Sequence, residues 1–221
     1  RWAFRHVREL TRTARIGRGD GPVRPLPPAG SPLDLGGIAF AHGDRSWTLS
    51  EALAATHTDA FLVLHRGELV SESYFDGMRP DDTHLLMSVS KSLTSVLVGV
   101  YVERGAIDLA ATVADHVPAL LGTGWEGATI EHVLAMRTGT DFDEDDYADP
   151  ESLGRLIEEI SGYVPRTRPD IAPDTPTLIT ALPNVREHGS RFQYRSIITD
   201  VLAWVIESVG HGRFHELYAR E

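Results

Sequence analysis

Apolar residues recur at helical spacing most clearly between residues 88 and 104. They fall three and four positions apart, which places them on one face of a helix, and Gly105 follows as a helix-ending residue. This pattern predicts a mostly buried helix that begins directly at Ser88. The residues on the predicted apolar face are Leu93, Val96, Leu97, Val100 and Tyr101.

Weaker patterns of the same kind predict further helices. Residues 129–137 and 151–161 carry helical patterns that end at or near a glycine. A surface helix is expected over residues 1–16, where small and apolar positions lie between arginines. The last clear element covers residues 196–209. Its predicted apolar face contains Val201, Leu202, Val205 and Ile206.

Residues 59–76 show a strand pattern instead. An apolar run of strand-forming residues covers 61–64, a turn sequence containing Gly67 follows, and a second run covers 69–75. This order predicts a hairpin of two antiparallel strands. Several helices and one hairpin, without regular alternation of strand and helix, indicate the α+β class rather than a doubly wound sheet.

Glycine and proline dominate two segments that are expected to lack regular structure. Residues 17–37 are typical of a linker or wrapping arm, and the prolines between 164 and 183 predict an extended loop. Together with the preceding helix, the first segment would form an N-terminal arm over residues 1–37. The remaining residues, 38–221, are expected to form one domain.

Composition excludes several classes of protein. The 221 residues carry a formal net charge of −11, which argues against a nucleic-acid binder. No stretch approaches the roughly 20 consecutive apolar residues of a membrane span, and the arginine-rich N-terminus lacks the apolar core of a signal peptide. We therefore expect no nucleic-acid or membrane partner and, by default, a cytoplasmic protein. The absence of cysteine excludes disulfides, thiolate metal sites and a cysteine nucleophile.

Several familiar motifs occur only in incomplete form. A G-x-G-x-x-G sequence at 122–127 follows no predicted strand, so we do not interpret it as a nucleotide site. The acidic loop at 141–152 lacks the glycine and the final glutamate of a calcium loop. His215 and Glu216 lack the second histidine of a zinc motif, and no G-x-S-x-G sequence is present. No metal site is therefore expected.

Lys91 is the only lysine among 21 basic residues, and it follows Ser88 by three positions. Residues three apart at the start of a helix lie on one face, so the lysine nitrogen can reach the serine oxygen. A serine hydroxyl needs a base to become a nucleophile, and a lysine that is desolvated in an apolar setting can be that base. Free N–H groups at the helix N-terminus would help to stabilise an oxyanion. The alternative is a serine-rich helix start with a solvent-directed lysine, which spacing alone leaves open.

The sequence around this pair resembles the nucleophile motif of the serine β-lactamase and penicillin-binding-protein superfamily. The motif is Met87-Ser88-Val89-Ser90-Lys91-Ser92-Leu93. Within the superfamily, the chain resembles in particular the nylon-oligomer amidases, the 6-aminohexanoate-dimer hydrolases. This resemblance covers nearly the whole chain, and the residues that carry it are 1–4, 58–64, 84–87, 192–194 and 199–204.

The resemblance implies roles for five residues. Ser88 would be the nucleophile that forms an acyl-enzyme, and Lys91 the general base or proton relay. Tyr194 would pass a proton to the leaving amine or alcohol, and Ser196 takes the place of the family's asparagine two residues on. Tyr147 matches a tyrosine on the substrate loop of the nylon-oligomer enzymes; the equal alternative is a surface aromatic on an acidic loop.

The resemblance also implies a fold and an activity. An antiparallel sheet flanked by helices would lie beside a mostly helical region at about 106–190, with the site between them. The reaction would be hydrolysis of a carboxylic ester or a linear amide, a small-molecule substrate, without a metal or organic cofactor. Two alternatives stay open: a β-lactamase or D-Ala-D-Ala peptidase-like enzyme, and a catalytically idle homologue that acts as a binding protein.

Two features depart from the family pattern. An asparagine that follows the tyrosine motif in the nylon-oligomer enzymes is replaced by Ile198. Family members also continue past Glu221, and their third motif and remaining strands lie in that continuation. We therefore expect that this sequence is a fragment or an incomplete copy, and that its two hairpin strands leave an exposed sheet edge.

Overall fold

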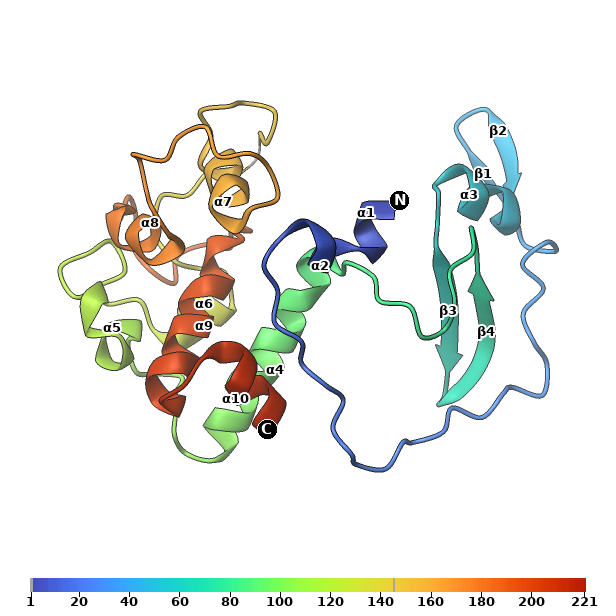
Figure 1. The fold of residues 1–221 in the computed structure, drawn as a ribbon, viewed down its shortest axis with the longest axis horizontal. Helices are drawn as coiled ribbons and strands as arrows, with labels where there is room; N and C mark the ends of the chain where they lie inside the picture. Colours follow the sequence, from blue (N-terminus) through green and yellow to red (C-terminus); the bar gives the residue numbers. More distant parts are fainter. Residues whose placement is uncertain (1, 145) are drawn as a thin grey trace. The chain divides into compact units, whose positions relative to one another are not determined.

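A computed structural model of the chain describes residues 2–144 and 146–221, so Arg1 of the N-terminal motif and Asp145 of the acidic loop lie outside the described residues. The chain forms two compact units (Figure 1). Unit 1 comprises Arg1–Val7 and Asp20–Leu85, and unit 2 comprises Arg8–Gly19 and Leu86–Glu221. The two units are defined by the contacts that residues make within each unit. The predicted division into an arm and a domain at residue 37 stays a prediction.

The N-terminal helix is much shorter than the predicted helix over residues 1–16. Two single turns are present, α1 at Trp2–Arg5 and α2 at Val7–Leu10, and neither contains a buried residue. Short helices are unstable without burial of an apolar face, because nucleation fixes several residues for one hydrogen bond. The prediction of a single helix is therefore wrong, whereas the expected irregular segment at 17–37 contains only an isolated bridge and turns.

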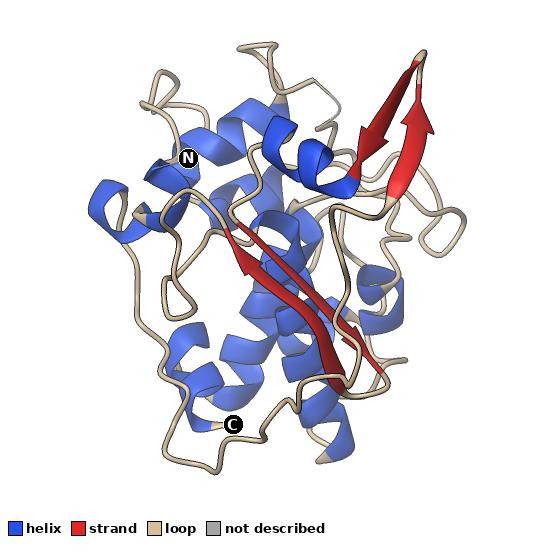
Figure 2. Ribbon diagram, turned by 90° about the vertical axis from the view of Figure 1, so that its right-hand side faces the viewer, coloured by secondary structure: helices blue, strands red, loops and turns tan. Residues whose placement is uncertain are grey.

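Two separate hairpins provide the strands of the described residues (Figure 2). The predicted hairpin is confirmed: β3 at Ala60–His65 pairs antiparallel with β4 at Glu68–Tyr74. Arg66 and Gly67 both have positive φ, 53° and 85°, as the tight turns that match strand twist require. On one face of β3, Leu62 and Leu64 are exposed, in line with the expected incomplete sheet.

The sequence patterns missed the first hairpin and the helix after it. Strands β1 at Ala39–His42 and β2 at Arg45–Thr48 pair antiparallel, and α3 follows at Leu49–Ala55. A recognisable signal was present for α3. Thr48 and Glu51 form a capping box, in which each side chain accepts a hydrogen bond from the other residue's backbone N–H.

The segment that leads to the serine motif is anchored within unit 1. The His84 ring lies with Nε2 3.1 Å from the buried Asp59 carboxylate and with Nδ1 2.8 Å from the Leu85 carbonyl. Leu85 N in turn donates to Phe4 O at 2.7 Å. These contacts join the N-terminus, the start of the β3 hairpin and the approach to the serine motif.

Helix α9, at Ile197–Gly210, is the central helix of unit 2 (Figure 1). Its predicted apolar face is confirmed, since all four of its residues are buried. The helices that pack against it are α4 at Ser90–Glu103, α5 at Val113–His116, α6 at Ile130–Leu134, α8 at Thr175–Ala181 and α10 at Phe214–Arg220. The remaining helical elements are the 3₁₀ turns η1 at Met87–Val89 and η2 at Pro118–Leu120, and helix α7 at Leu153–Ser161.

Helix α4 differs from the mostly buried helix that was predicted. Leu97 and Tyr101 are buried against the core, but Leu93 and Val96 on the neighbouring stripe are exposed. The apolar pattern therefore covers more of the helix circumference than unit 2 buries. Gly105, with a φ of 69°, ends the helix as expected, because this left-handed conformation favours glycine.

Part of the predicted loop at 164–183 is a helix. Asp174 caps α8 by accepting a hydrogen bond from Thr177 N, and Pro176 occupies the first turn of the helix. Proline is compatible with this position because the first N–H groups of a helix have no partner within it. The prediction treated every proline in the segment as a helix breaker and is wrong here. Helix α10 was also not predicted.

The incomplete glycine motif at 122–127 has a structural explanation. A side chain at Gly124 would place its Cβ 2.3 Å from Leu182 O, so two backbone segments approach each other closely at this glycine. The neighbouring Trp125 is fully buried, and its indole Nε1 donates to Ile179 O in α8 at 2.9 Å. The glycine pattern thus belongs to the packing of this loop against α8.

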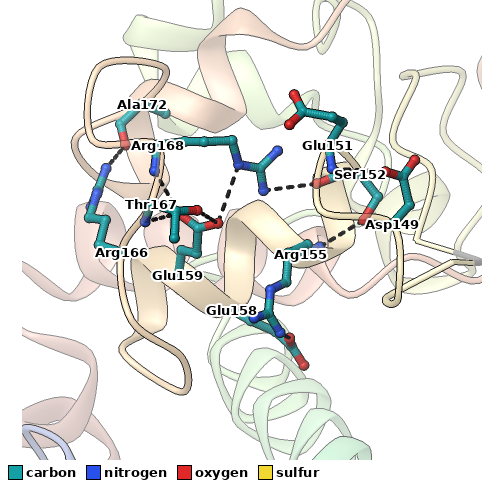
Figure 3. Close-up of polar contacts among 10 residues, drawn as sticks. All are labelled: Asp149, Glu151, Ser152, Arg155, Glu158, Glu159, Arg166, Thr167, Arg168 and Ala172. Carbon is teal, nitrogen blue, oxygen red and sulfur yellow. Dashed lines mark hydrogen bonds and ion pairs between the residues drawn. The ribbon is translucent and has the colours of Figure 1, made fainter.

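A buried carboxylate fastens the loop after α7 to that helix (Figure 3). Glu159 accepts hydrogen bonds from the backbone N–H and hydroxyl of Thr167 and from the backbone N–H and guanidinium of Arg168. Arg168 also donates to Ser152 O, at the first turn of α7. Burial raises the pKa of Glu159, but the hydrogen bonds outweigh it and lower the pKa to about 2.

Glu159→Gln is expected to reduce the stability of unit 2 in a pH-dependent way. The carboxyl pKa is lower in the folded chain than in the unfolded chain, so its contribution is complete above pH 4.5 and is lost as the pH falls toward 2. Urea denaturation at several pH values measures this. The variant should be less stable than the wild type at pH 7, and the difference should shrink steadily below pH 4.5. A difference independent of pH would contradict the prediction. The control is Glu158→Gln, which removes a partly exposed surface pair with Arg155.

Candidate active site

Ser88 and Lys91 meet at the junction of a 3₁₀ turn and an α-helix. Ser88 lies in η1 and is exposed, whereas Lys91 is half-buried in the first turn of α4. Lys91 Nζ donates a hydrogen bond to Ser88 Oγ at 2.8 Å, the contact that the three-residue spacing predicts. The pair is therefore in direct contact.

The backbone beside Ser88 is strained. Met87 has a φ of 47°, in the left-handed region, which costs a residue with a side chain roughly 1–2 kcal/mol. Two local hydrogen bonds hold this turn: Ser90 Oγ donates to Met87 O, and Val89 N donates to Leu86 O at 3.1 Å. Strain that surrounding contacts maintain is a feature of functional sites.

The surroundings of Lys91 are less apolar than the sequence interpretation requires. Lys91 borders a cavity of about 160 Å³ between α4, α6 and α9. Hydroxyl groups of Ser92, Ser95 and Thr199 line it together with apolar side chains, so the lining of the cavity is mixed. Asp200 on α9 is exposed at the surface, and the positive charge of Lys91 acts to lower its pKa against a rise caused by desolvation. The remaining lining residues are Val133, Leu134, Met136, Ile198 and Leu202.

Tyr194 is positioned by the residues on either side of it. Gln193 N donates to Met136 O at 2.9 Å, which fixes the chain before the tyrosine. After it, the buried Arg195 guanidinium donates to Thr138 O at 2.9 Å and to Phe142 O at 3.3 Å. Burial, together with the nearby Arg186, lowers the pKa of Arg195 to about 10. The Tyr194 segment is therefore held firmly while its side chain stays 42% exposed.

The Tyr194 side chain lies next to the Ser88–Lys91 pair. The Lys91 nitrogen is 5.4 Å from the centre of the tyrosine ring. Burial is the largest single influence on the phenol and raises its pKa. Hydrogen bonds with Ser88 and Lys91, and the charge of Lys91, outweigh it, so the pKa of Tyr194 is lowered. A phenol with a lowered pKa is a better proton donor near neutral pH.

Ser196 is bound by an acid that the sequence interpretation did not single out. Glu144 is only 7% exposed, and it accepts hydrogen bonds from Ser196 N at 2.6 Å and from Ser196 Oγ at 3.1 Å. In the sequence, Glu144 is one of several acids in the loop at 141–152. No local signal distinguishes it from the neighbouring acids of that loop, since only the tertiary structure decides which of them is buried.

Tyr147 lies beside Glu144 and is 41% exposed. Burial raises the pKa of Tyr147, the negative charge of Glu144 raises it further, and a hydrogen bond with Ser196 offsets part of the rise. Gly154 of α7 lies behind both loop residues, since a Cβ there would come within 3.1 Å of the Tyr147 ring and 3.2 Å of Glu144. Tyr147 thus contacts the predicted site residues, although either role predicted for it stays a prediction.

The five predicted site residues therefore form two adjacent groups within unit 2. Ser88, Lys91 and Tyr194 form one, and Tyr147 and Ser196, joined by Glu144, form the other. The charge of Glu144 acts on Tyr194 as well as on Tyr147. Ile198, where the resemblance led us to expect an asparagine, is buried in the core, and its side chain offers no polar atom to the site.

In residues 2–144 and 146–221, no three histidine or acidic side chains are grouped to hold a metal ion. Within the same residues, no helix combines the length and apolar character needed to cross a membrane.

Comparison with known proteins identifies relatives of the chain. The Beta-lactamase family model matches residues 48–221. A 6-aminohexanoate-dimer hydrolase of Paenarthrobacter ureafaciens is 42% identical over 217 residues, which are 98% of this chain and 52% of that protein. The chain thus spans about half the length of this relative.

Solved structures of related hydrolases also resemble the chain. A Bacillus anthracis structure provisionally described as a 6-aminohexanoate-dimer hydrolase matches with a TM-score of 0.85 at 25% identity, over 97% of this chain and 56% of that one. EstCE1, a hydrolase with promiscuous acyltransferase activity, matches with a TM-score of 0.54 at 19% identity, over 73% of this chain and 44% of that one, and so shares the fold. The predicted superfamily and the predicted β-lactamase-like α+β fold are confirmed. The chain belongs to the Beta-lactamase family.

Proposed function

We propose that the protein is a serine hydrolase that forms an acyl-enzyme on Ser88 with a carboxylic ester or a linear amide. The observation that carries this proposal is the 2.8 Å hydrogen bond between Lys91 Nζ and Ser88 Oγ, with the Tyr194 ring centre 5.4 Å from the same Lys91 nitrogen. Membership of the Beta-lactamase family and 42% identity with a 6-aminohexanoate-dimer hydrolase support it.

Acylation would use all three residues. The neutral Lys91 amine accepts the Ser88 proton while Ser88 Oγ attacks the carbonyl carbon and forms the new C–O bond. The resulting oxyanion collapses, the bond to the leaving nitrogen or oxygen breaks, and Tyr194 donates its proton to that atom. The protonated Lys91 then restores the Tyr194 proton. The products of this half-reaction are the acyl-enzyme and a free amine or alcohol.

Deacylation would reverse these roles with water as the nucleophile. Lys91, neutral again, accepts a proton from water as the water oxygen attacks the ester carbonyl of the acyl-enzyme. The bond to Ser88 Oγ breaks, the protonated Lys91 returns its proton to that oxygen, and a carboxylic acid leaves. The cycle balances without a metal or organic cofactor.

Covalent labelling tests the nucleophile. An activated phosphonate is expected to form one adduct on Ser88 in the complete protein, located by mass spectrometry of its peptides, and Ser88→Ala should remove it. Ser90→Ala is the matched control, since Ser90 lies on the same turn and its hydroxyl donates to Met87 O. An unlabelled Ser88 in folded protein would indicate the idle homologue and contradict the proposal.

A substrate panel separates the remaining possibilities. p-Nitrophenyl esters and linear ω-amino amides should be hydrolysed, with rates that depend on Ser88. Turnover of nitrocefin with neither of the other classes would favour a β-lactamase-like enzyme instead. The linear amides are included because the P. ureafaciens relative is described as a 6-aminohexanoate-dimer hydrolase.

A further inference from the structure

We propose that Glu144 is a positioning residue of this site: its carboxylate fixes the Ser196 hydroxyl and, through it, the side chain of Tyr147 beside Tyr194. This proposal rests on the proposed function. Glu144 itself would touch neither substrate nor the reacting atoms, so its effect would pass through the residues that it holds.

The two hydrogen bonds to Glu144 set the direction of the Ser196 proton. Ser196 donates its backbone N–H to one carboxylate oxygen and its hydroxyl to the other. A hydroxyl has a single proton, so the Ser196 oxygen is left as an acceptor toward other partners. Tyr147 lies beside Glu144 against Gly154, and Ser196 acts to lower the pKa of its phenol, so this acceptor is available to the Tyr147 hydroxyl. Glu144 would thereby determine which way the Tyr147 hydroxyl points.

Burial of Glu144 makes its hydrogen bonds to Ser196 necessary. Glu144 is 7% exposed, and a carboxylate in such a place is costly unless hydrogen bonds compensate it. Gly154 leaves room for Glu144 and Tyr147 side by side, because a Cβ at that position would contact both. The carboxylate therefore cannot turn away to solvent without leaving the space that α7 encloses.

The charge of Glu144 adds a second effect. The groups that act on Tyr194 are Ser88, Lys91 and Glu144, and those that act on Tyr147 are Ser196, Tyr194, Glu144 and Glu158 of α7. Lys91 lowers the pKa of Tyr194, whereas burial and the charge of Glu144 raise it. Replacement of the Glu144 carboxylate by an amide removes one of the two opposing effects, so both tyrosines should lose their protons at lower pH.

Three variants of the complete protein test this proposal by the pH dependence of kcat/KM for an amide and a p-nitrophenyl ester. Glu144→Gln should lower kcat about tenfold and move the basic limb of the profile to lower pH. Glu144→Asp keeps the charge but is too short for both hydrogen bonds, so kcat should fall without that shift. Ser196→Ala should behave like Glu144→Asp. Glu159→Gln, which changes a buried carboxylate outside the site, is the control and should leave the basic limb in place.

Titration of tyrosine absorbance gives a readout that needs no turnover. Glu144→Gln should advance tyrosinate formation to lower pH relative to wild type, and the advance should be smaller when Tyr194→Phe is also present. An unshifted titration in folded Glu144→Gln, or wild-type kcat in both Ser196→Ala and Glu144→Asp, would overturn the proposal. If Ser88→Ala retains full turnover, the proposed function fails, while the titration still decides the role of Glu144.

Discussion

Lys91→Arg is expected to lower turnover by about 10³-fold while the fold is kept. The amine must accept the Ser88 proton from a distance of 2.8 Å, and a guanidinium keeps its own protons at neutral pH. Arginine supplies a permanent positive charge, so any activity that needs only a cation at this position would survive the change. Steady-state hydrolysis of a p-nitrophenyl ester at neutral pH measures the effect.

Two controls separate lost proton transfer from lost structure. Far-ultraviolet circular dichroism and thermal melting should match the wild type, because Lys91 is half-buried and borders an open cavity. Lys91→Ala should regain part of its activity when small primary amines are added, whereas Lys91→Arg should not, since its side chain fills the same space. Turnover by Lys91→Arg within tenfold of wild type at neutral pH would show that the lysine is not the base.

Tyr194→Phe is expected to slow hydrolysis of a linear amide by about 10²-fold, and of a p-nitrophenyl ester by much less. An amine leaves only after it receives a proton, whereas p-nitrophenolate leaves readily without one. The lowered pKa of Tyr194 fits it for this donation. The measurement is kcat for the two substrates in the variant and the wild type.

A matched tyrosine gives the control for this prediction. Tyr163→Phe removes a phenol from an exposed position just after α7 and should leave both rates unchanged. The informative quantity is the ratio of amide loss to ester loss in Tyr194→Phe. A ratio of one would remove the assignment of Tyr194 as proton donor, even if both rates fell.

Local sequence signals located the elements whose contacts lie close together in the chain. The Ser88–Lys91 hydrogen bond follows from a spacing of three at a helix start. The hairpin of β3 and β4 follows from strand-forming runs on either side of Gly67. Helix α9 and its apolar face were predicted from the spacing of apolar residues. Several helices pack around α9 and bury that face.

The errors have equally local causes. Helix α8 was missed because Pro176 was taken as a breaker, although its place in the first turn is compatible with a helix. The helix predicted over residues 1–16 failed because no apolar face is buried there. In α4, the exposure of Leu93 and Val96 depends on which elements cover the helix, a fact that periodicity does not contain.

The amino-acid sequence by itself determined the family resemblance, the α+β class and the contact between one serine and the only lysine, because each depends on motifs or on residues within one helical turn. Tertiary structure alone decided that Tyr194 meets this pair and that Glu144, rather than another acid of its loop, binds Ser196. These contacts join segments far apart in the chain. Their formation depends on how α4, α7 and α9 pack. Burial then determines which carboxylate is hydrogen-bonded within the protein and how the pKa values of the neighbouring tyrosines are shifted.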